Sequence, residues 1–358
     1  MVWALSRKLR YPGVYRCIGK LSPFSHPWRV GTTTTRRSGL PLRVPPLPCP
    51  FPSEVSPHVE RVNTETLDWL VDTGILEDAE TVERYRQAKY GWLGARTYPY
   101  AEHHTLRLVT DWCVWLFAFD DAFCESGRGA GELTRALPRL FTVLDDLEAG
   151  QEVDDVFART LLEIKGRISA YGDDDQLDRW RSVTKDYLFA QVWEAANCEA
   201  DVVPQVDDYL FMRRRTGAML TVFALIDVAS GRPLTPEEWR HPDVKAITES
   251  ANDVVVWDND LISYAKESDG VNSRNNLVSV LTRHRGYSRQ QAMEAIGAMR
   301  NRAIADMVAL RPSLEALGSE AVLAYVRGLE FWISGSVDYS LTSSRYTTAW
   351  QREGESAG

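Results

Sequence analysis

Two aspartates stand at the end of a long apolar stretch of the chain. Residues 111–119 are almost entirely apolar, and they run directly into Asp120 and Asp121, with Glu125 one helical turn further on. Burying such carboxylates costs on the order of several kcal/mol per ion unless they are paired, and no Lys or Arg occurs within 108–127. A bound divalent cation would resolve this conflict, since hard oxygen ligands suit magnesium. A solvated helix end is the alternative interpretation of this motif on its own.

A second group of oxygen-bearing side chains follows another apolar helical stretch. Asn259, Ser263 and Glu267 are spaced four residues apart, which places them on one stripe of a helix at about 6 Å per step. A column of amide, hydroxyl and carboxylate oxygens is typical of a metal site with weak and strong ligands. A structural polar stripe would more often contain Glu and Lys, although that interpretation stays open for the motif alone.

Arginines occur in two further apolar settings. Arg213, Arg214 and Arg215 interrupt an apolar helical run, and Arg345 with Tyr346 follows an aromatic stretch near the end of the chain. A guanidinium group keeps its charge when buried, and its planar fork matches phosphate oxygens. Each arginine alone is equally compatible with a surface position or an ion pair. Together with the candidate metal ligands, they indicate a site for a phosphorylated ligand whose other end is apolar.

The elements that position these residues are predicted to be helices. Capping signals occur at Asn63, at Thr235 with Glu238, and at Ser288 with Gln291. Period-two alternation bounded by turn residues is absent, so we expect one all-α domain over 51–350, followed by a short tail at 351–358. The predicted helices span about 63–76, 101–120, 130–148, 154–170, 175–199, 205–230, 236–266, 273–284, 288–310 and 319–342.

Charge and composition exclude several classes of protein. The net charge of −9 argues against nucleic-acid binding, and the sequence lacks an apolar run of about 18 residues for stable membrane insertion. Five widely spaced cysteines favour a reducing compartment, so a cytoplasmic location is predicted.

Residues 1–50 carry nine Lys or Arg, no acid and a Pro-rich end. A disordered arm or an upstream translation start explains this segment best, and a transit peptide or a functional basic tail are the alternatives.

The four motifs, in this order and at these spacings, resemble the class I terpene synthases of bacteria, in particular their single-domain sesquiterpene cyclases. The resemblance covers about 45–350 and rests on Asp120-Asp121-x-x-x-Glu125, on Asn259-Asp260-x-x-Ser263-x-x-Lys266-Glu267, on an arginine 46 positions before Asn259, and on Arg345-Tyr346. It implies the α-helical class I terpenoid synthase fold around a central cavity. Three magnesium ions would be held there by Asp120, Asp121, Glu125, Asn259, Ser263 and Glu267. Asp121 is less often a direct ligand in the family, and its alternative role is to orient Arg345.

The resemblance also implies how the substrate is held. The diphosphate would be bound by Arg213, Lys266, Arg345 and Tyr346, and Arg213 would act as its sensor. Thr216 and Gly217 occupy the linker and effector positions that follow the sensor, although some members carry Asp where this chain has Thr216. Aromatic faces stabilise carbocations without offering a nucleophile. The pocket candidates are Phe117, Trp332 and Tyr339.

The implied reaction is magnesium-dependent ionisation of a linear isoprenyl diphosphate, most simply farnesyl diphosphate, and cyclisation of the cation to a sesquiterpene. Cyclisation of geranyl or geranylgeranyl diphosphate is an alternative. A chain-elongating prenyltransferase would resemble a design with Asp-Asp-x-x-Asp in both halves, and the Asn-Ser-Glu triad here argues against it. A non-catalytic helical isoprenoid-binding protein would not need every ligand. A monomer or homodimer is expected, and the product skeleton is not fixed by the sequence.

Overall fold

The computed structural model describes residues 42–125, 129–148, 150–267 and 274–347, and every regular element within these ranges is a helix. The predicted all-α fold class is thereby confirmed. No helix of this described part is long and apolar enough to cross a bilayer. The helices are α2 (Val59–Asp72), α3 (Ala79–Ala88), α4 (Tyr90–Thr97), α5 (His103–Asp120), the π-helical turn η1 (Asp121–Glu125), α6 (Ala130–Asp145), α7 (Val156–Tyr171), α8 (Asp174–Glu199), α9 (Val206–Thr216), α10 (Met219–Phe223), α11 (Ile226–Ser230), α12 (Pro236–Arg240), α13 (Pro242–Glu267), α14 (Leu277–Arg285), α15 (Arg289–Ala316) and α16 (Glu320–Thr342).

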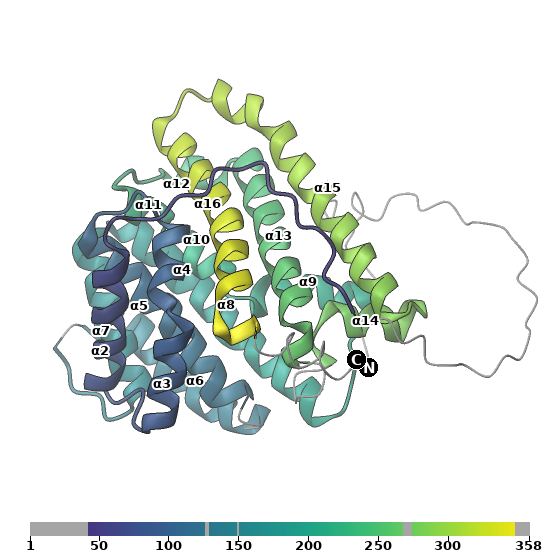
Figure 1. The fold of residues 1–358 in the computed structure, drawn as a ribbon. Helices are drawn as coiled ribbons and strands as arrows, with labels where there is room; N and C mark the ends of the chain where they lie inside the picture. Colours follow the sequence, from purple (N-terminus) through teal and green to yellow (C-terminus); the bar gives the residue numbers. More distant parts are fainter. Residues whose placement is uncertain (1–41, 126–128, 149, 268–273, 348–358) are drawn as a thin grey trace, which may run out of the picture. The chain divides into compact units, whose positions relative to one another are not determined.

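Long helices enclose a central cavity. Helix α13 packs along α15 and α16, α16 packs along α4, and α4 packs along α5 (Figure 1). Helix α8 lies against α6 and α9 on another side. Side chains from α5, α8, α13 and α16 line the cavity together with those at the junction of α9 and α10. The two helices that carry the predicted metal motifs, α5 and α13, therefore both contribute to one internal space.

Helix α5 is held in register by a buried carboxylate. Asp111 is fully buried and accepts hydrogen bonds from Thr66 Oγ1, Arg107 Nε and Arg167 Nη1, each at 2.7 Å. A buried carboxylate is tolerated only when it is paired in this way. The bonds to Thr66 and Arg167 tie α5 to α2 and α7 and so fix the position of Asp120, two and a half turns further along α5.

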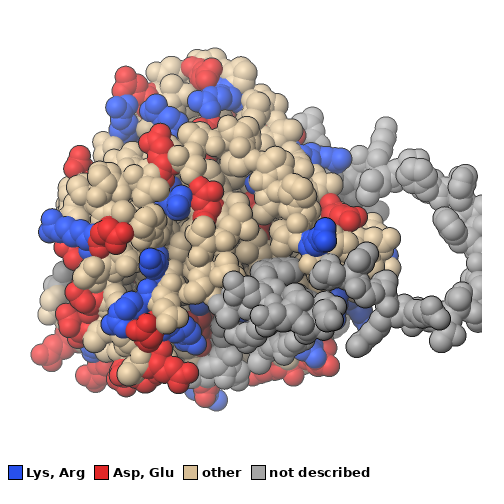
Figure 2. All heavy atoms as spheres, in the orientation of Figure 1, with Lys and Arg blue, Asp and Glu red and all other residues tan. Residues whose placement is uncertain are grey.

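Charged side chains of both signs are interspersed over the face seen in Figure 2. The exposed ion pairs of the described chain include Arg232 with Glu320 at 2.7 Å and Arg311 with Glu315 at 3.1 Å. Exposed pairs of this kind contribute only about 0–1 kcal/mol each. The fold is therefore stabilised mainly by its apolar core, in which Trp112 and Trp180 are completely buried and in edge-to-face contact at 5.0 Å.

The helix boundaries differ from the sequence prediction in four places. Helix α2 begins before Asn63, which is therefore not a cap, and α3 and α4 were not predicted. The run predicted at 205–230 is broken into α9, α10 and α11, since Ala218 adopts a left-handed conformation with φ of 60°. The run predicted at 236–266 is divided between α12 and α13. The two capping boxes that begin with Thr235 and Ser288 are confirmed.

The Pro-rich segment 42–52 runs as extended chain across α15 and α16 (Figure 1). Gln290 Oε1 accepts from the backbone N–H of Arg43 at 3.1 Å, the Pro48 carbonyl accepts from Arg300 Nη1, and the Pro52 carbonyl accepts from Ser334 Oγ at 2.6 Å. Residues 42–50, which the sequence assigns to the N-terminal arm, thus contact the helices. We propose that the catalytic unit starts at about residue 42.

Truncation after residue 41 and truncation after residue 52 are expected to have different effects. Removing 1–41 should leave the melting temperature and turnover at the full-length values, because the contacts above are retained. Removing 1–52 deprives the fully buried Arg300 of its carbonyl partner and exposes α15 and α16. This should lower the melting temperature by several degrees. Thermal melts of the full-length chain and both truncations check this, and an equal loss in both truncations would contradict the boundary.

Candidate active site

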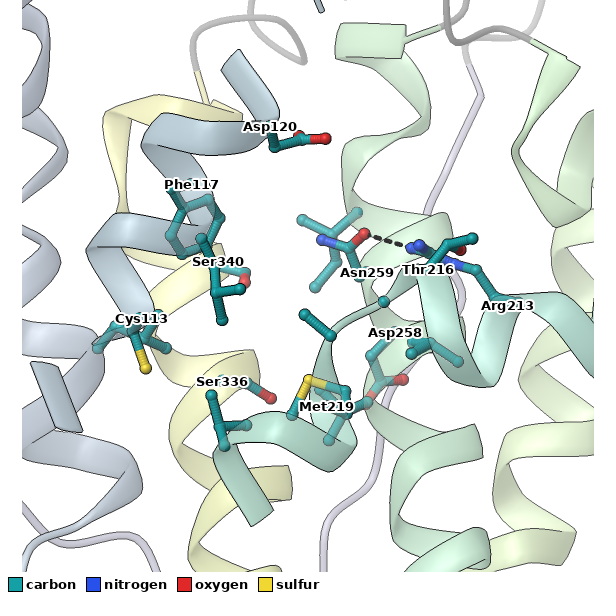
Figure 3. A pocket seen from close by; sticks show the side chains of 18 of the residues that line it. Cys113, Phe117, Asp120, Arg213, Thr216, Met219, Asp258, Asn259, Ser336 and Ser340 are labelled. Atoms are coloured by element: carbon teal, nitrogen blue, oxygen red, sulfur yellow. Dashed lines mark hydrogen bonds between the residues drawn. The ribbon is translucent and has the colours of Figure 1, made fainter. Parts of the chain in front are cut away.

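The central cavity has a polar end and an apolar end. In Figure 3, Asp120 on α5, Asn259 on α13 and Arg213 on α9 lie around its polar end, and Met219 and Ser336 lie toward its base. Most of the wall away from the polar end is apolar. It includes Leu93, Cys113, Leu116, Phe117, Met219, Val222, Val255, Val256, Ile262, Trp332 and Tyr339.

The aspartate-rich motif divides into two environments. Asp120 lines the cavity, and Figure 3 shows its carboxylate pointing into the open space. Asp121 instead accepts hydrogen bonds from Tyr85 Oη at 2.8 Å and from Arg345 Nη2 at 3.0 Å. Burial acts to raise the pKa of Asp121, but the Arg345 guanidinium outweighs it and holds that pKa below its usual value. The geometry thus favours orientation of Arg345 over metal ligation. The side chain of Glu125 lies outside the described residues.

The oxygen stripe on α13 has the donor set that a hard divalent cation requires. Asn259 and Glu267 line the cavity, and Asn276 Nδ2 donates to Glu267 Oε2 at 3.0 Å, which orients that carboxylate. Between them, the Ser263 hydroxyl is buried and lacks any hydrogen-bond partner in the described part of the chain. A buried hydroxyl oxygen without a partner costs stability. A divalent cation coordinated by this oxygen and its neighbours in the column would remove that cost. The residues therefore fit a divalent metal.

The Arg213 side chain reaches from α9 to α13. Its Nη2 donates to Asn259 Oδ1 at 2.8 Å (dashed line in Figure 3), and its Nε donates to Asp260 Oδ1 at 2.9 Å. Asp260 is completely buried and also accepts from Tyr209 Oη at 2.8 Å. Burial raises the pKa of Asp260 to about 6, against the opposing effect of Arg213. A buried carboxylate thus positions the guanidinium at the mouth of the cavity.

The other two arginines of the triplet point elsewhere. Arg214 forms a forked ion pair with Asp253 on α13, with N–O distances of 2.6 and 2.7 Å. Arg215 donates to the Phe211 carbonyl at 2.9 Å and lies over the Phe211 ring at 4.1 Å on the outer surface of α9. Only Arg213 of the three lines the cavity.

The chain breaks its helix directly after Arg213. Helix α9 ends at Thr216, and α10 begins at Met219, after the left-handed Ala218. Thr216 and Gly217 both line the cavity at this break. A Cβ atom at Gly217 would lie 2.4 Å from Val256 Cγ1 on α13, so a side chain at this position would force the two elements apart. The predicted effector position therefore lies where the end of α9 approaches α13 closely, and the predicted linker position directly precedes it.

The C-terminal arginine completes the polar end. Arg345 lies over the Phe117 ring at 4.9 Å, and its Nη1 donates to Tyr90 Oη at 3.0 Å. Tyr346 Oη accepts from Asn259 Nδ2 at 3.5 Å. Both residues line the cavity, as does Lys266 on α13. The four predicted diphosphate-binding residues thus converge from three separate parts of the sequence on one end of the cavity.

All three predicted pocket aromatics line the cavity. Phe117 lies one turn before Asp121, Trp332 makes an edge-to-face contact with Tyr98 at 5.5 Å, and Tyr339 donates its hydroxyl to the Ala88 carbonyl at 2.9 Å. Because the Tyr339 hydroxyl is engaged with the backbone, this residue presents its ring to the cavity. Tyr187 on α8 is a fourth aromatic lining residue, and the sequence reasoning missed it.

Glu194 on α8 is the main cavity residue that sequence reasoning missed. Its pKa is raised to about 8, chiefly because the cavity wall shields the carboxylate from water; Arg213 opposes this shift, and the charge of Asp120 adds to it. No sequence motif contains Glu194, and its proximity to Arg213 exists only once α8 packs against α9. Tyr209 and Asn276 also lie outside the motifs, and the contacts of Asp260 with Arg213 and Tyr209 could not be inferred from its place in the second motif, since all these roles depend on contacts between helices.

Glu194 should make the metal-free protein less stable as the pH rises. A carboxyl whose folded-state pKa is about 8 holds a proton that the unfolded chain releases near the ordinary glutamate pKa of 4.5. The native state therefore binds more protons between these values, and stability falls by up to about 1.4 kcal/mol per pH unit in that window. Glu194→Gln should remove this part of the slope in urea unfolding with chelator between pH 5 and 8. The exposed Glu237→Gln should keep it, and identical slopes in both variants would refute the assignment.

Comparisons with known proteins place this geometry in a family. Residues 111–306, more than half of the chain, match the profile described as terpene synthase family 2, C-terminal metal binding. The chain is 80% identical over 322 residues to 4-epi-cubebol synthase ((2E,6E)-farnesyl diphosphate cyclizing) from Streptosporangium roseum, covering 90% of this chain and 98% of that one. It is 32% identical to (+)-T-muurolol synthase ((2E,6E)-farnesyl diphosphate cyclizing) from Roseiflexus castenholzii, over 83% of this chain and 92% of the relative.

Solved structures give the same result for the fold. The crystal structure of the SVS_A2 protein from ancestral sequence reconstruction superposes with a TM-score of 0.77 at 28% identity, covering 84% of this chain and 90% of that one. The crystal structure of α-eudesmol synthase has a TM-score of 0.75 at 22% identity and supports the fold alone. With the profile match, the 80% identical relative and the column of oxygen-bearing side chains on α13, the chain belongs to terpene synthase family 2, whose C-terminal region binds a divalent metal.

Proposed function

We propose that this chain is a magnesium-dependent cyclase that converts farnesyl diphosphate into a sesquiterpene alcohol of the cubebol type. The observation that carries the proposal is the two-ended cavity, with Asp120, Asn259, Glu267, Arg213 and Arg345 at one end and an apolar, aromatic wall beyond. The substrate and product class are supported by the 80% identical relative, whose name specifies farnesyl diphosphate and an alcohol.

Asp120, Asn259, Ser263 and Glu267 would hold the magnesium ions, with Glu125 completing a set of three ions as the family resemblance implies. When bound, the metal neutralises the diphosphate and so lowers the barrier to breaking the allylic C–O bond. Arg213, Lys266, Arg345 and Tyr346 bind the same diphosphate and stabilise the charge that it gains as it departs. Asp260 and Asp121 orient Arg213 and Arg345, respectively.

The apolar end of the cavity then folds the chain of the substrate and excludes bulk water. Phe117, Tyr187, Trp332 and Tyr339 line this region, and their ring faces stabilise positive charge while offering no lone pair for capture. The diphosphate released at the polar end stays in the same cavity, so it is available to accept the proton that is lost at the end of the reaction.

Incubation of the full-length protein and magnesium with geranyl, farnesyl and geranylgeranyl diphosphate, followed by gas chromatography and mass spectrometry of the volatiles, tests the proposal. The expected result is C15 alcohol from farnesyl diphosphate at the highest kcat/KM. Preferred turnover of the C10 or C20 substrate would overturn the assignment of the substrate. Formation of a longer diphosphate after addition of isopentenyl diphosphate would point to chain elongation, and binding without any turnover would point to a non-catalytic isoprenoid-binding protein.

A further inference from the structure

Two serine hydroxyls interrupt the apolar wall of the cavity. Ser336 and Ser340 lie on α16 and line the cavity, and Figure 3 shows both hydroxyl oxygens directed into its open space. Because they are four residues apart on one helix, their Cβ atoms are neighbours at about 5–6 Å. The residues around and opposite them include Cys113, Phe117 and Met219, which offer no strong hydrogen-bond partner.

The two hydroxyls differ in how they are satisfied. Ser336 Oγ donates to the Ile333 carbonyl at 3.2 Å, which leaves its lone pairs available as acceptors. Ser340 is only 9% exposed and lines the cavity, and its hydroxyl, directed into the open space (Figure 3), is able to donate and to accept there. The pair therefore offers a donor and two acceptors four residues apart on one helix, a combination that suits a water molecule between them.

The other polar groups near this part of the wall are already engaged. Asp258 also lines the cavity, but Arg300 Nε donates to its Oδ1 at 2.9 Å and Arg300 Nη2 to its Oδ2 at 3.2 Å. The Tyr339 hydroxyl donates to the Ala88 carbonyl. Glu194 lies beside Arg213 and Thr216, toward the diphosphate end. Ser336 and Ser340 are thus the hydroxyls best placed to hold a water among the hydrocarbon of the substrate.

We propose that Ser336 and Ser340 bind the water molecule that ends the reaction, and so determine that the product is an alcohol. The inference rests on the proposed function, in which a carbocation forms in this cavity. A lone pair of the water oxygen forms the new C–O bond to the cationic carbon, and one O–H bond of that water breaks. The proton passes to the diphosphate released in the ionisation step. No oxidant or reductant is needed, since cation and water give alcohol and a proton.

The test compares wild type with Ser336→Ala, Ser340→Ala and the double variant, using farnesyl diphosphate and magnesium in water enriched in oxygen-18. Alanine removes the hydroxyl and little volume. The expected result is labelled alcohol from wild type and a fall of about tenfold in the alcohol-to-hydrocarbon ratio in the double variant, with diphosphate release within about threefold of wild type. The matched control is Ser334→Ala on the same helix, whose hydroxyl donates to the Pro52 carbonyl and does not line the cavity. It should keep the wild-type ratio.

The outcomes separate this inference from the function on which it rests. A labelled alcohol whose share is unchanged in the double variant would overturn the role of the serines and leave the cyclase intact. An unlabelled wild-type alcohol would likewise overturn it, because the oxygen would then come from the diphosphate. Hydrocarbon products alone from wild type would instead refute the alcohol assignment of the proposed function. The single variants keep the test decisive if the double variant does not fold, since either should lower the ratio.

Discussion

Asn259→Leu and Glu267→Gln are each expected to lower diphosphate release from farnesyl diphosphate by about a hundredfold or more. Both side chains line the polar end of the cavity on α13, on either side of the orphaned Ser263 hydroxyl. Leucine fills the volume of Asn259 but offers no oxygen, and it also removes the acceptor of Arg213. Glutamine keeps the shape of Glu267 but removes its charge, which is the strongest attraction that this column offers a cation.

The measurement that separates a metal role from a structural one is thermal stability. Magnesium and inorganic diphosphate together should raise the melting temperature of wild type, because a ligand that binds only the native state stabilises it by mass action. Both variants should lose this shift while keeping wild-type helicity. Glu249→Gln is the matched control, since Glu249 lies on α13, is exposed and pairs with Arg214. Near-normal rates with a normal magnesium shift in both variants would remove the α13 triad from the metal site.

Much of this site could be predicted from the sequence because its residues lie in local motifs. Asn259, Ser263 and Glu267 follow helical spacing, so their common face results from the geometry of one helix. The sensor Arg213 could be selected from its neighbours only through the family resemblance, in which the sensor lies 46 positions before the second motif. The structure brings these separate stretches to one cavity.

The parts that could not be predicted depend on contacts between distant segments. Glu194 and Asn276 lie in no sequence motif, and they matter because α8, α9, α13 and the start of α14 meet at the cavity. Asp260 lies in the second motif, but its contact with Arg213 exists only in the folded chain. The break after Thr216 was missed because Gly217 and Ala218 lie within an apolar run that favours helix. The close approach of Gly217 to Val256 exists only in the folded chain. Residues 42–50 were assigned to the N-terminal arm because an extended Pro-rich segment gives no periodic signal of burial.

Arg213→Lys is expected to lower the rate of diphosphate release by about a hundredfold or more, whereas Arg215→Lys should leave it within about twofold. The Arg213 guanidinium is held by Asp260 and Asn259 through separate nitrogens, and it faces the cavity. Lysine keeps the charge but has one nitrogen, so it cannot satisfy these partners and bind a diphosphate at the same time. Arg215 lies over Phe211 on the outer surface of α9, where the same substitution removes only an exposed stacking contact.

The two variants are best compared at saturating magnesium, with diphosphate release and the magnesium–diphosphate melting shift measured on both. If Arg213 senses the diphosphate, Arg213→Lys should lose most of kcat and most of the melting shift together, because the bidentate contact grows as charge develops on the leaving group. If Arg213 only holds α9 against α13, its loss should lower the melting temperature without ligand and leave the ligand-induced shift unchanged. Comparable rate losses at the two positions, or a larger loss at Arg215, would show that the sensor is not Arg213. Because both substitutions keep the charge and lie on the same helix, a loss confined to Arg213→Lys could not be attributed to net charge or to α9 as a whole.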